Sequence, residues 1–292
     1  MSPSNEVRKS KAERTAEARE KARLIREAQL KKDKRNKLLI GWGIVAAVVA
    51  ILAIVALVVT TSIRQNTPIA DQGPVPAGAN ANGGVTLLAN TEVKETDDAS
   101  TVDIANVPAK PETPPTPVVA PGAEAEEGQP VKVVAYIDFI CPVCKRFEDT
   151  YNDALTGLRN EGKISLEYRP LGFLDRMSST NYSSRSANAA ACVADTAPDK
   201  YAEYVEVLFT NQPAEGGAGL SDDKLKSLAS EIGADINSCV DNKTFRPYVK
   251  YSTELASNIG VTGTPTVFID GKQWDGGTDL NAEIQAAIDA KA

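Results

Sequence analysis

Histidine is absent from the 292 residues of this chain, and only four cysteines are present. Without imidazole, the chain cannot build a Ser-His-Asp or Cys-His catalytic group, and it cannot hold zinc through histidine. A four-cysteine zinc site usually contains two CxxC pairs. Here only Cys141 and Cys144 have that spacing, whereas Cys192 and Cys239 stand alone. We therefore expect no metal and no cofactor, and the paired thiols need another explanation.

Charge is missing from 26 consecutive residues, 38–63, which read LLIGWGIVAAVVAILAIVALVVTTSI. A helix of that length extends about 39 Å, more than the roughly 30 Å of a bilayer's hydrocarbon core. A cleavable signal peptide would have a shorter apolar core of about 7–15 residues and a small-residue cleavage site. A buried helix of a soluble protein would seldom be so long and so uniformly apolar. We expect one uncleaved transmembrane helix.

The charges on the two sides of this segment predict its orientation. Residues 1–37 contain 13 basic and 6 acidic residues, which leaves 19 basic and 33 acidic residues in the remainder. Because basic flanks stay in the cytosol, we expect a single-pass protein of the cell membrane, with a cytosolic N-terminus and the rest of the chain extracytoplasmic. A lipid-binding or nucleic-acid-binding role for the basic arm needs more assumptions, so we expect no nucleic-acid partner.

Residues 64–130 are rich in proline, alanine and glycine and poor in large apolar side chains. Such a composition seldom offsets the entropy lost on ordering, so we expect an extended, partly polyproline-like linker. Residues 83–90 have weak strand character and are a candidate for an outlying strand of the domain that follows.

A compact domain is expected over residues 131–292. The run VKVVAYIDFI is typical of a strand buried on both faces. Apolar residues then recur at helical spacing from Phe147 to Leu158, and a second strand follows. A helical block occupies about residues 180–257, before a late strand and a terminal amphipathic helix. This order predicts an α/β fold with an all-helical insertion.

The sequence CPVC lies where the first strand gives way to the first helix. Pro142 suits the first helical position. Cys141 would then be the N-cap residue, where free backbone N–H groups and the helix dipole stabilise a thiolate. Cys144 would be more enclosed and within reach of a disulfide with Cys141. A purely structural disulfide is not favoured, because so short a loop constrains the unfolded chain little. We interpret the two cysteines as a redox pair.

A further motif, GVTGTPT, occupies residues 260–266, directly before the late strand. With the CPVC junction and the helical block, it makes residues 131–292 resemble the thioredoxin-fold thiol–disulfide oxidoreductases of the DsbA-like branch, in a membrane-anchored bacterial form. The resemblance implies that Cys141 and Cys144 are catalytic. It also implies that Pro265 is cis beside them and that the backbone at Thr264 pairs with the substrate chain.

Two positions depart from the family pattern. Val143 stands where the best-known oxidising members have a histidine that helps to stabilise the reduced thiolate. Ala135 stands where members often have an acid, six residues before the first cysteine. Asp138, three residues before Cys141, is a candidate proton acceptor, although it could equally accept a backbone hydrogen bond. These differences leave the direction of electron flow open.

Cys192 and Cys239 lie in different parts of the helical block. If Cys141 pairs with Cys144, they are the remaining pair, and an oxidising exterior would permit their disulfide. Closing a loop of about 48 residues would stabilise the fold by roughly 4 kcal/mol. We expect a structural disulfide here, rather than two buried thiols.

The leading hypothesis is a membrane-tethered extracytoplasmic enzyme that introduces disulfides into exported, unfolded or reduced proteins. The resemblance further implies re-oxidation by a quinone-linked membrane partner. Three alternatives remain: a disulfide isomerase or reductase, for instance for cytochrome maturation; a non-catalytic thioredoxin-like binding module of the cell envelope; and a metal-binding envelope protein.

Overall fold

The computed structural model describes residues 11–65, 68–96, 101–113 and 115–291. Residues 1–10 of the predicted basic arm, residues 66–67, 97–100 and 114 of the predicted linker, and residue 292 lie outside the described residues. The chain divides into two units, Met1–Thr61 and Ser62–Ala292, and each is considered by itself.

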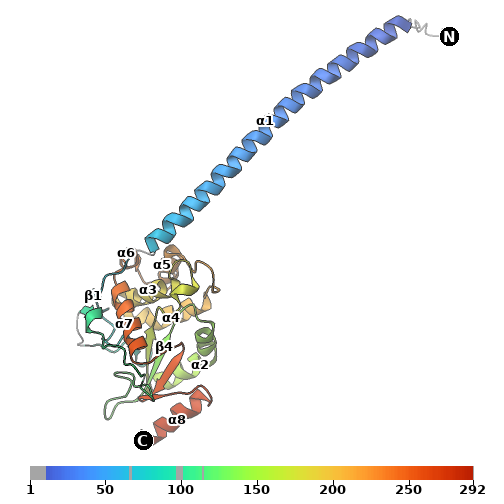
Figure 1. The fold of residues 1–292 in the computed structure, drawn as a ribbon. Coiled ribbons are helices and arrows are strands. Elements are labelled where there is room, and N and C mark those ends of the chain that lie inside the picture. The colour runs from blue at the N-terminus through green and yellow to red at the C-terminus, as the bar shows by residue number, and fades with distance from the viewer. Residues whose placement is uncertain (1–10, 66–67, 97–100, 114, 292) are drawn as a thin grey trace, which may run out of the picture. The chain divides into compact units, whose positions relative to one another are not determined.

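The first unit contains most of one long helix, α1 (Lys11–Gln65), which includes the predicted span 38–63 (Figure 1). Among the described residues, one helical segment, Thr15–Ala56, is long and apolar enough to cross a membrane, with a mean hydropathy of 2.9 in its apolar window. Large apolar side chains such as Trp42 and Ile51 are exposed along it. These features fit a single-pass membrane anchor.

The second unit is built on a five-stranded sheet with the strand order β2-β5-β4-β6-β7. Strands β4 (Val131–Ile137) and β5 (Ile164–Pro170) are parallel, and the other neighbouring pairs are antiparallel. The central strand β4 is buried along nearly its whole length, as its continuous apolar run predicts. The remaining strands are β2 (Val85–Leu87), β6 (Thr266–Ile269) and β7 (Lys272–Gln273).

Helices cover both faces of this sheet. On one face, α2 (Pro142–Asn160) and α8 (Leu280–Lys291) bury Leu155 and Ile284 in the same cluster as Val133 of β4. On the other face, α7 (Arg246–Asn258) contributes Ala256 to a smaller cluster that contains Tyr136 of β4. The α/β fold predicted from the order of elements is confirmed, and the arrangement agrees with the thioredoxin-like fold that the family resemblance implies.

The segment between β5 and β6 is helical, as expected. It comprises the short 3-10 helices η2 (Asp175–Met177) and η3 (Pro198–Lys200) and the α-helices α3 (Tyr182–Thr196), α4 (Tyr201–Thr210), α5 (Asp222–Glu231), α6 (Asn237–Asp241) and α7. Helices α3 to α6 lie together in Figure 1. A disulfide joins Cys192 on α3 to Cys239 on α6, with a Cα–Cα distance of 5.9 Å.

The described part of the predicted linker is not an extended spacer. Strands β1 (Gln72–Pro74) and β3 (Thr101–Asp103) form a small antiparallel sheet. Strand β2, inside the predicted range 83–90, pairs with β5 and forms one edge of the main sheet. The Tyr248 hydroxyl donates a hydrogen bond to the backbone oxygen of Asn80 at 2.9 Å. The low content of large apolar side chains led to the wrong prediction for this part of the chain, because small residues can be buried by packing closely against the domain. A Cβ on Gly84 would overlap the buried side chain of Glu167, so any larger residue there would have to displace that side chain.

Candidate active site

Cys141 occupies the N-cap of α2, directly after the turn that ends β4. Its backbone N–H donates to the Asp138 carbonyl oxygen at 3.0 Å, and Pro142 begins the helix. No side chain caps this helix end. The first N–H groups of α2 are therefore available to the Cys141 sulfur, as the sequence predicts.

The Cys141 thiol is unusually acidic, with its pKa lowered to about 5. The largest cause is a hydrogen bond from the Cys144 thiol. The Thr264 side chain and the backbone N–H groups of Cys144 and Val143 lower this pKa further, against an opposing effect of burial. At neutral pH, Cys141 is consequently a thiolate. Its side chain is 5% exposed, and the protonated thiol donates to the Thr264 carbonyl oxygen at 3.3 Å.

The Cys144 thiol has the opposite character. It is fully buried, and its pKa lies well above the ordinary value. Burial is the main cause, followed by the hydrogen bond to Cys141 and the charge on that residue. Both cysteines are free thiols in this structure. The pair therefore combines a stabilised thiolate at Cys141 with a neutral, more deeply buried thiol at Cys144.

The other predicted site residues lie around this pair. The Thr264–Pro265 peptide bond is cis, and the Thr264 carbonyl oxygen contacts Cys141. Thr264 and Pro265 are partly exposed, and Val143 is 45% exposed.

Asp138 is fully buried, and its pKa is raised to about 7, chiefly by burial. Its carboxylate accepts hydrogen bonds from the backbone N–H groups of Ile140 (3.1 Å) and Leu174 (2.9 Å). Its own backbone N–H lies against the Cys144 sulfur. The carboxylate of Asp138 therefore holds the turn, whereas the part of this residue that contacts Cys144 is its backbone N–H, and the role of proton acceptor stays a prediction.

Two polar residues near the site were not predicted from the sequence. Glu148 is buried and accepts a hydrogen bond from the Tyr168 hydroxyl at 3.0 Å, and burial raises its pKa to about 8. Its position four residues after Cys144, on the same helix face, is a signal that the sequence contains. Gln212 contacts the active-site turn from the end of α4. No sequence pattern reveals that contact, because it depends on how the insertion packs.

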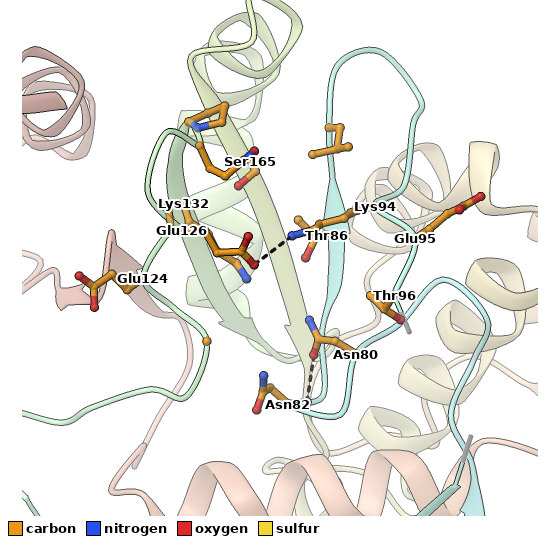
Figure 2. A pocket seen from close by; sticks show the side chains of 15 residues that line it. Asn80, Asn82, Thr86, Lys94, Glu95, Thr96, Glu124, Glu126, Lys132 and Ser165 are labelled. Atoms are coloured by element: carbon orange, nitrogen blue, oxygen red, sulfur yellow. Dashed lines mark hydrogen bonds and ion pairs between the residues drawn. The ribbon is translucent and has the colours of Figure 1, made fainter. Parts of the chain in front are cut away.

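A separate cavity of about 550 Å³ opens beside the start of β4 (Figure 2). Lys94 faces Glu126 across it at 3.9 Å, and Lys132 in its wall pairs with the buried Glu167 at 2.7 Å. Lys132 lies near the beginning of β4, whereas Cys141 follows its end, so at least about 17 Å of strand separates them. We assign this cavity no part in thiol chemistry. The described residues contain no cluster of three or more side chains suited to a metal ion.

Comparisons with known proteins agree with this fold. The sequence model of the family described as Thioredoxin matches residues 125–290. Disulfide bond formation protein D of Bacillus subtilis is 26% identical over 152 residues, which cover 50% of this chain and 66% of that protein. Reduced disulfide bond oxidoreductase (DsbG) of Mycobacterium tuberculosis has a TM-score of 0.50 at 30% identity, over 60% of this chain and 90% of that one.

The chain is also similar to part of a protein named as a kinase, serine/threonine-protein kinase PknE of Mycobacterium tuberculosis. It is 31% identical over 163 residues, which cover 52% of this chain but 28% of the kinase. The chain thus spans under a third of this relative and just under two thirds of protein D.

Proposed function

We propose that this chain, which belongs to the thioredoxin family, is a membrane-tethered extracytoplasmic thiol–disulfide oxidoreductase that introduces disulfides into exported proteins. The observation that carries the proposal is the contrast between its two free thiols. Cys141 has a pKa of about 5 at the start of α2, whereas Cys144 is buried with a raised pKa. Such a contrast suits dithiol exchange, because one sulfur leaves easily as a thiolate while the other stays protonated.

In the proposed reaction, a client thiolate attacks the Cys141 sulfur of the oxidised 141–144 disulfide. The bond between the two enzyme sulfurs breaks, and the electron pair goes to Cys144, which takes up a proton. A second client thiolate then attacks the client sulfur of the mixed disulfide, and Cys141 leaves as a thiolate. Two electrons have passed to the enzyme, and the client has gained a disulfide. Stabilisation of the Cys141 thiolate favours this direction.

Other residues support these steps in the proposal. Pro142 starts the helix whose N–H groups face Cys141, and Val143 and Pro265 contact the approaching client. The carbonyl and N–H groups of the Thr264 segment pair with the client backbone as an added strand. Asp138, beside Cys144, exchanges the proton that Cys144 gains and loses. The Cys192–Cys239 disulfide stabilises the insertion.

The cellular arrangement follows from the anchor and its charges. The apolar helix fits a single membrane span. With 13 basic residues before residue 38, the positive-inside rule puts the domain outside the cytosol. Exported reduced proteins would then be the clients, and a quinone-linked membrane protein would re-oxidise the dithiol. The kinase activity named for PknE is not transferred, since the match covers only 28% of that protein.

Two single-cysteine variants test the proposal with a reduced, unfolded client. Cys141→Ala should abolish disulfide formation, because the attacked sulfur is gone. Cys144→Ala, first oxidised with glutathione disulfide so that Cys141 carries glutathione, should exchange that glutathione for a client with a single cysteine and accumulate the client–Cys141 mixed disulfide, because no Cys144 thiol is present to displace the client. Full turnover by Cys141→Ala would contradict the proposal. A Cys144→Ala protein that captures no client would favour the non-catalytic binding module.

An isomerase or reductase remains the second candidate, because the exposed Val143 puts no charge between the cysteines. The reduction potential of the 141–144 pair against glutathione distinguishes the candidates. A value of about −120 to −180 mV supports an oxidase or isomerase, whereas a value near or below about −270 mV supports a reductase. Metal analysis of the purified protein tests the remaining alternative, a metal-binding protein.

A further inference from the structure

Gln212 links the helical insertion to the active-site turn. It lies just beyond the end of α4 and is partly buried. Its side-chain Nε2 donates hydrogen bonds to the backbone oxygens of Phe139 (3.1 Å) and Cys141 (3.0 Å). One turn earlier, the ring of Phe209 packs against that of Phe139, with their centroids 5.1 Å apart. The end of α4 is thus attached to this turn by one polar and one aromatic contact.

The two acceptor oxygens belong to the Phe139–Ile140 and Cys141–Pro142 peptide units, which lie two units apart in the active-site turn. The Cys141 oxygen also accepts the N–H of Lys145 at 3.2 Å, which is the first hydrogen bond of α2. Pro142 has no N–H, so the Cys141–Pro142 peptide unit can be held by hydrogen bonds only through its oxygen. The orientation of this unit decides where the first turn of α2 points. Gln212 therefore bonds to the peptide unit whose orientation sets the direction of the first turn of α2.

A side-chain amide is well suited to this task. Its NH₂ group carries two hydrogens, one for each carbonyl oxygen, whereas a carboxylate has none to give. The amide also places partial positive charge against two oxygens that carry partial negative charge close to Cys141. Without it, the peptide units could turn and these oxygens would be less neutralised. Both changes would make a thiolate at Cys141 less stable.

We propose that Gln212 is a positioning residue for thiol–disulfide exchange: it holds the Phe139 and Cys141 carbonyl groups so that the N-terminus of α2 stays directed at the Cys141 sulfur. Its hydrogen bonds reach the backbone and not the sulfur, so it is not a catalytic residue. The inference rests on the proposed function and adds that the insertion helps to set the oxidising strength of the dithiol.

The test compares variants of the full-length protein in detergent. Gln212→Leu keeps the approximate size and removes both donors, and Gln212→Met is a second variant should the first fail to fold. Gln212→Lys supplies N–H donors again. Asn211→Leu is the matched control, because the neighbouring Asn211 amide bonds to the Val207 oxygen within α4 and not to the turn. The readouts are the pKa of Cys141, from the pH dependence of its alkylation, and the glutathione equilibrium.

Gln212→Leu or Gln212→Met should raise the Cys141 pKa by about one unit and shift the glutathione equilibrium constant about tenfold, equal to about 30 mV, toward a weaker oxidant. Asn211→Leu should change neither quantity, and Gln212→Lys should retain a wild-type or lower pKa. The inference is overturned if the Leu and Met variants match Asn211→Leu, or if Gln212→Lys raises the pKa as much as they do.

The wild-type protein separates this inference from the proposed function. If its 141–144 pair does not exchange with glutathione at all, the proposed function fails, whatever Gln212 does. If the pair exchanges normally and the Gln212 variants are indistinguishable from the control, the function stands and only the positioning role is lost.

Discussion

Raising the pH should stabilise the reduced protein through Cys141, and the size of the effect follows from its acidity. The folded-state pKa is about 5, against an ordinary value of 9.0. Because the folded pKa is the lower one, the folded state binds fewer protons than the unfolded state between about pH 5 and about pH 9. Stability from this group is therefore lost as the pH falls through about 5. It grows by about 1.4 kcal/mol per pH unit above that value, to about 2.7 kcal/mol at pH 7.

The assay is urea unfolding of the reduced full-length protein across this pH range, in detergent, with Cys141→Ser measured alongside. The subtraction is needed because Asp138 and Glu148, with pKa values of about 7 and 8, also titrate here and act with the opposite sign. A serine at the N-cap can stabilise α2, but that contribution does not vary with pH and leaves the slope unchanged. A difference curve that is flat between about pH 5 and 8 would refute the reasoning from α2 to thiolate stability.

Four further predictions concern individual side chains. Replacing Cys192 and Cys239 together by alanine should lower the free energy of unfolding by about 4 kcal/mol, with the Cys141 pKa unchanged in the folded protein; an unaltered urea midpoint would contradict a stabilising role. Glu167→Gln removes the charge that pairs with the buried Arg169 at 2.6 Å and should lower the free energy of unfolding by about 3–5 kcal/mol. Glu161→Gln, at an exposed pair with Lys163, should lower it by under about 1 kcal/mol. Equal losses in the two variants would contradict a special cost of breaking the buried pair. Val143→His should make the dithiol a stronger oxidant in the glutathione assay, because the exposed position can accept a charge without loss of packing; no change in potential would mean that the field of α2 already dominates. Asp138→Asn should remove an inflection near pH 7 from the rate of Cys144 re-oxidation if Asp138 exchanges its proton, and a persistent inflection would leave Asp138 only its hydrogen bonds to the turn.

The features that could be predicted from sequence are those fixed by local chemistry. The apolar run of β4 predicts a doubly buried strand, and Pro142 predicts the helix start that places Cys141 at the N-cap. The order of elements predicts the α/β fold with its helical insertion, because strand and helix periodicities can be recognised in short stretches of sequence. The position of Thr264–Pro265 beside Cys141 could be expected only through a family resemblance, since 123 residues separate Cys141 from Thr264.

The features that could not be predicted depend on close packing between distant segments. The linker prediction failed because it weighed apolar bulk, whereas residues such as Ala79 and Ala123 are buried by fitting against the domain. The contacts of Gln212 have the same origin, because a partly exposed amide at a helix end has no distinctive sequence environment. The hydrogen bond that Asp138 accepts from the backbone N–H of Leu174 is also a contact between separate segments, because Leu174 lies in the loop after β5, and the sequence does not reveal it.

The cross-link between α3 and α6 has a consequence for how the protein comes into being. If the domain folds outside the cytosol as proposed, each newly made copy arrives with four thiols and must itself be oxidised at Cys192 and Cys239 before its insertion is complete. The protein is then itself a substrate of thiol–disulfide exchange. Mature oxidised copies already in the membrane are suitable disulfide donors for newly made copies. Cells emptied of the protein should regain it slowly at first and faster as mature copies accumulate.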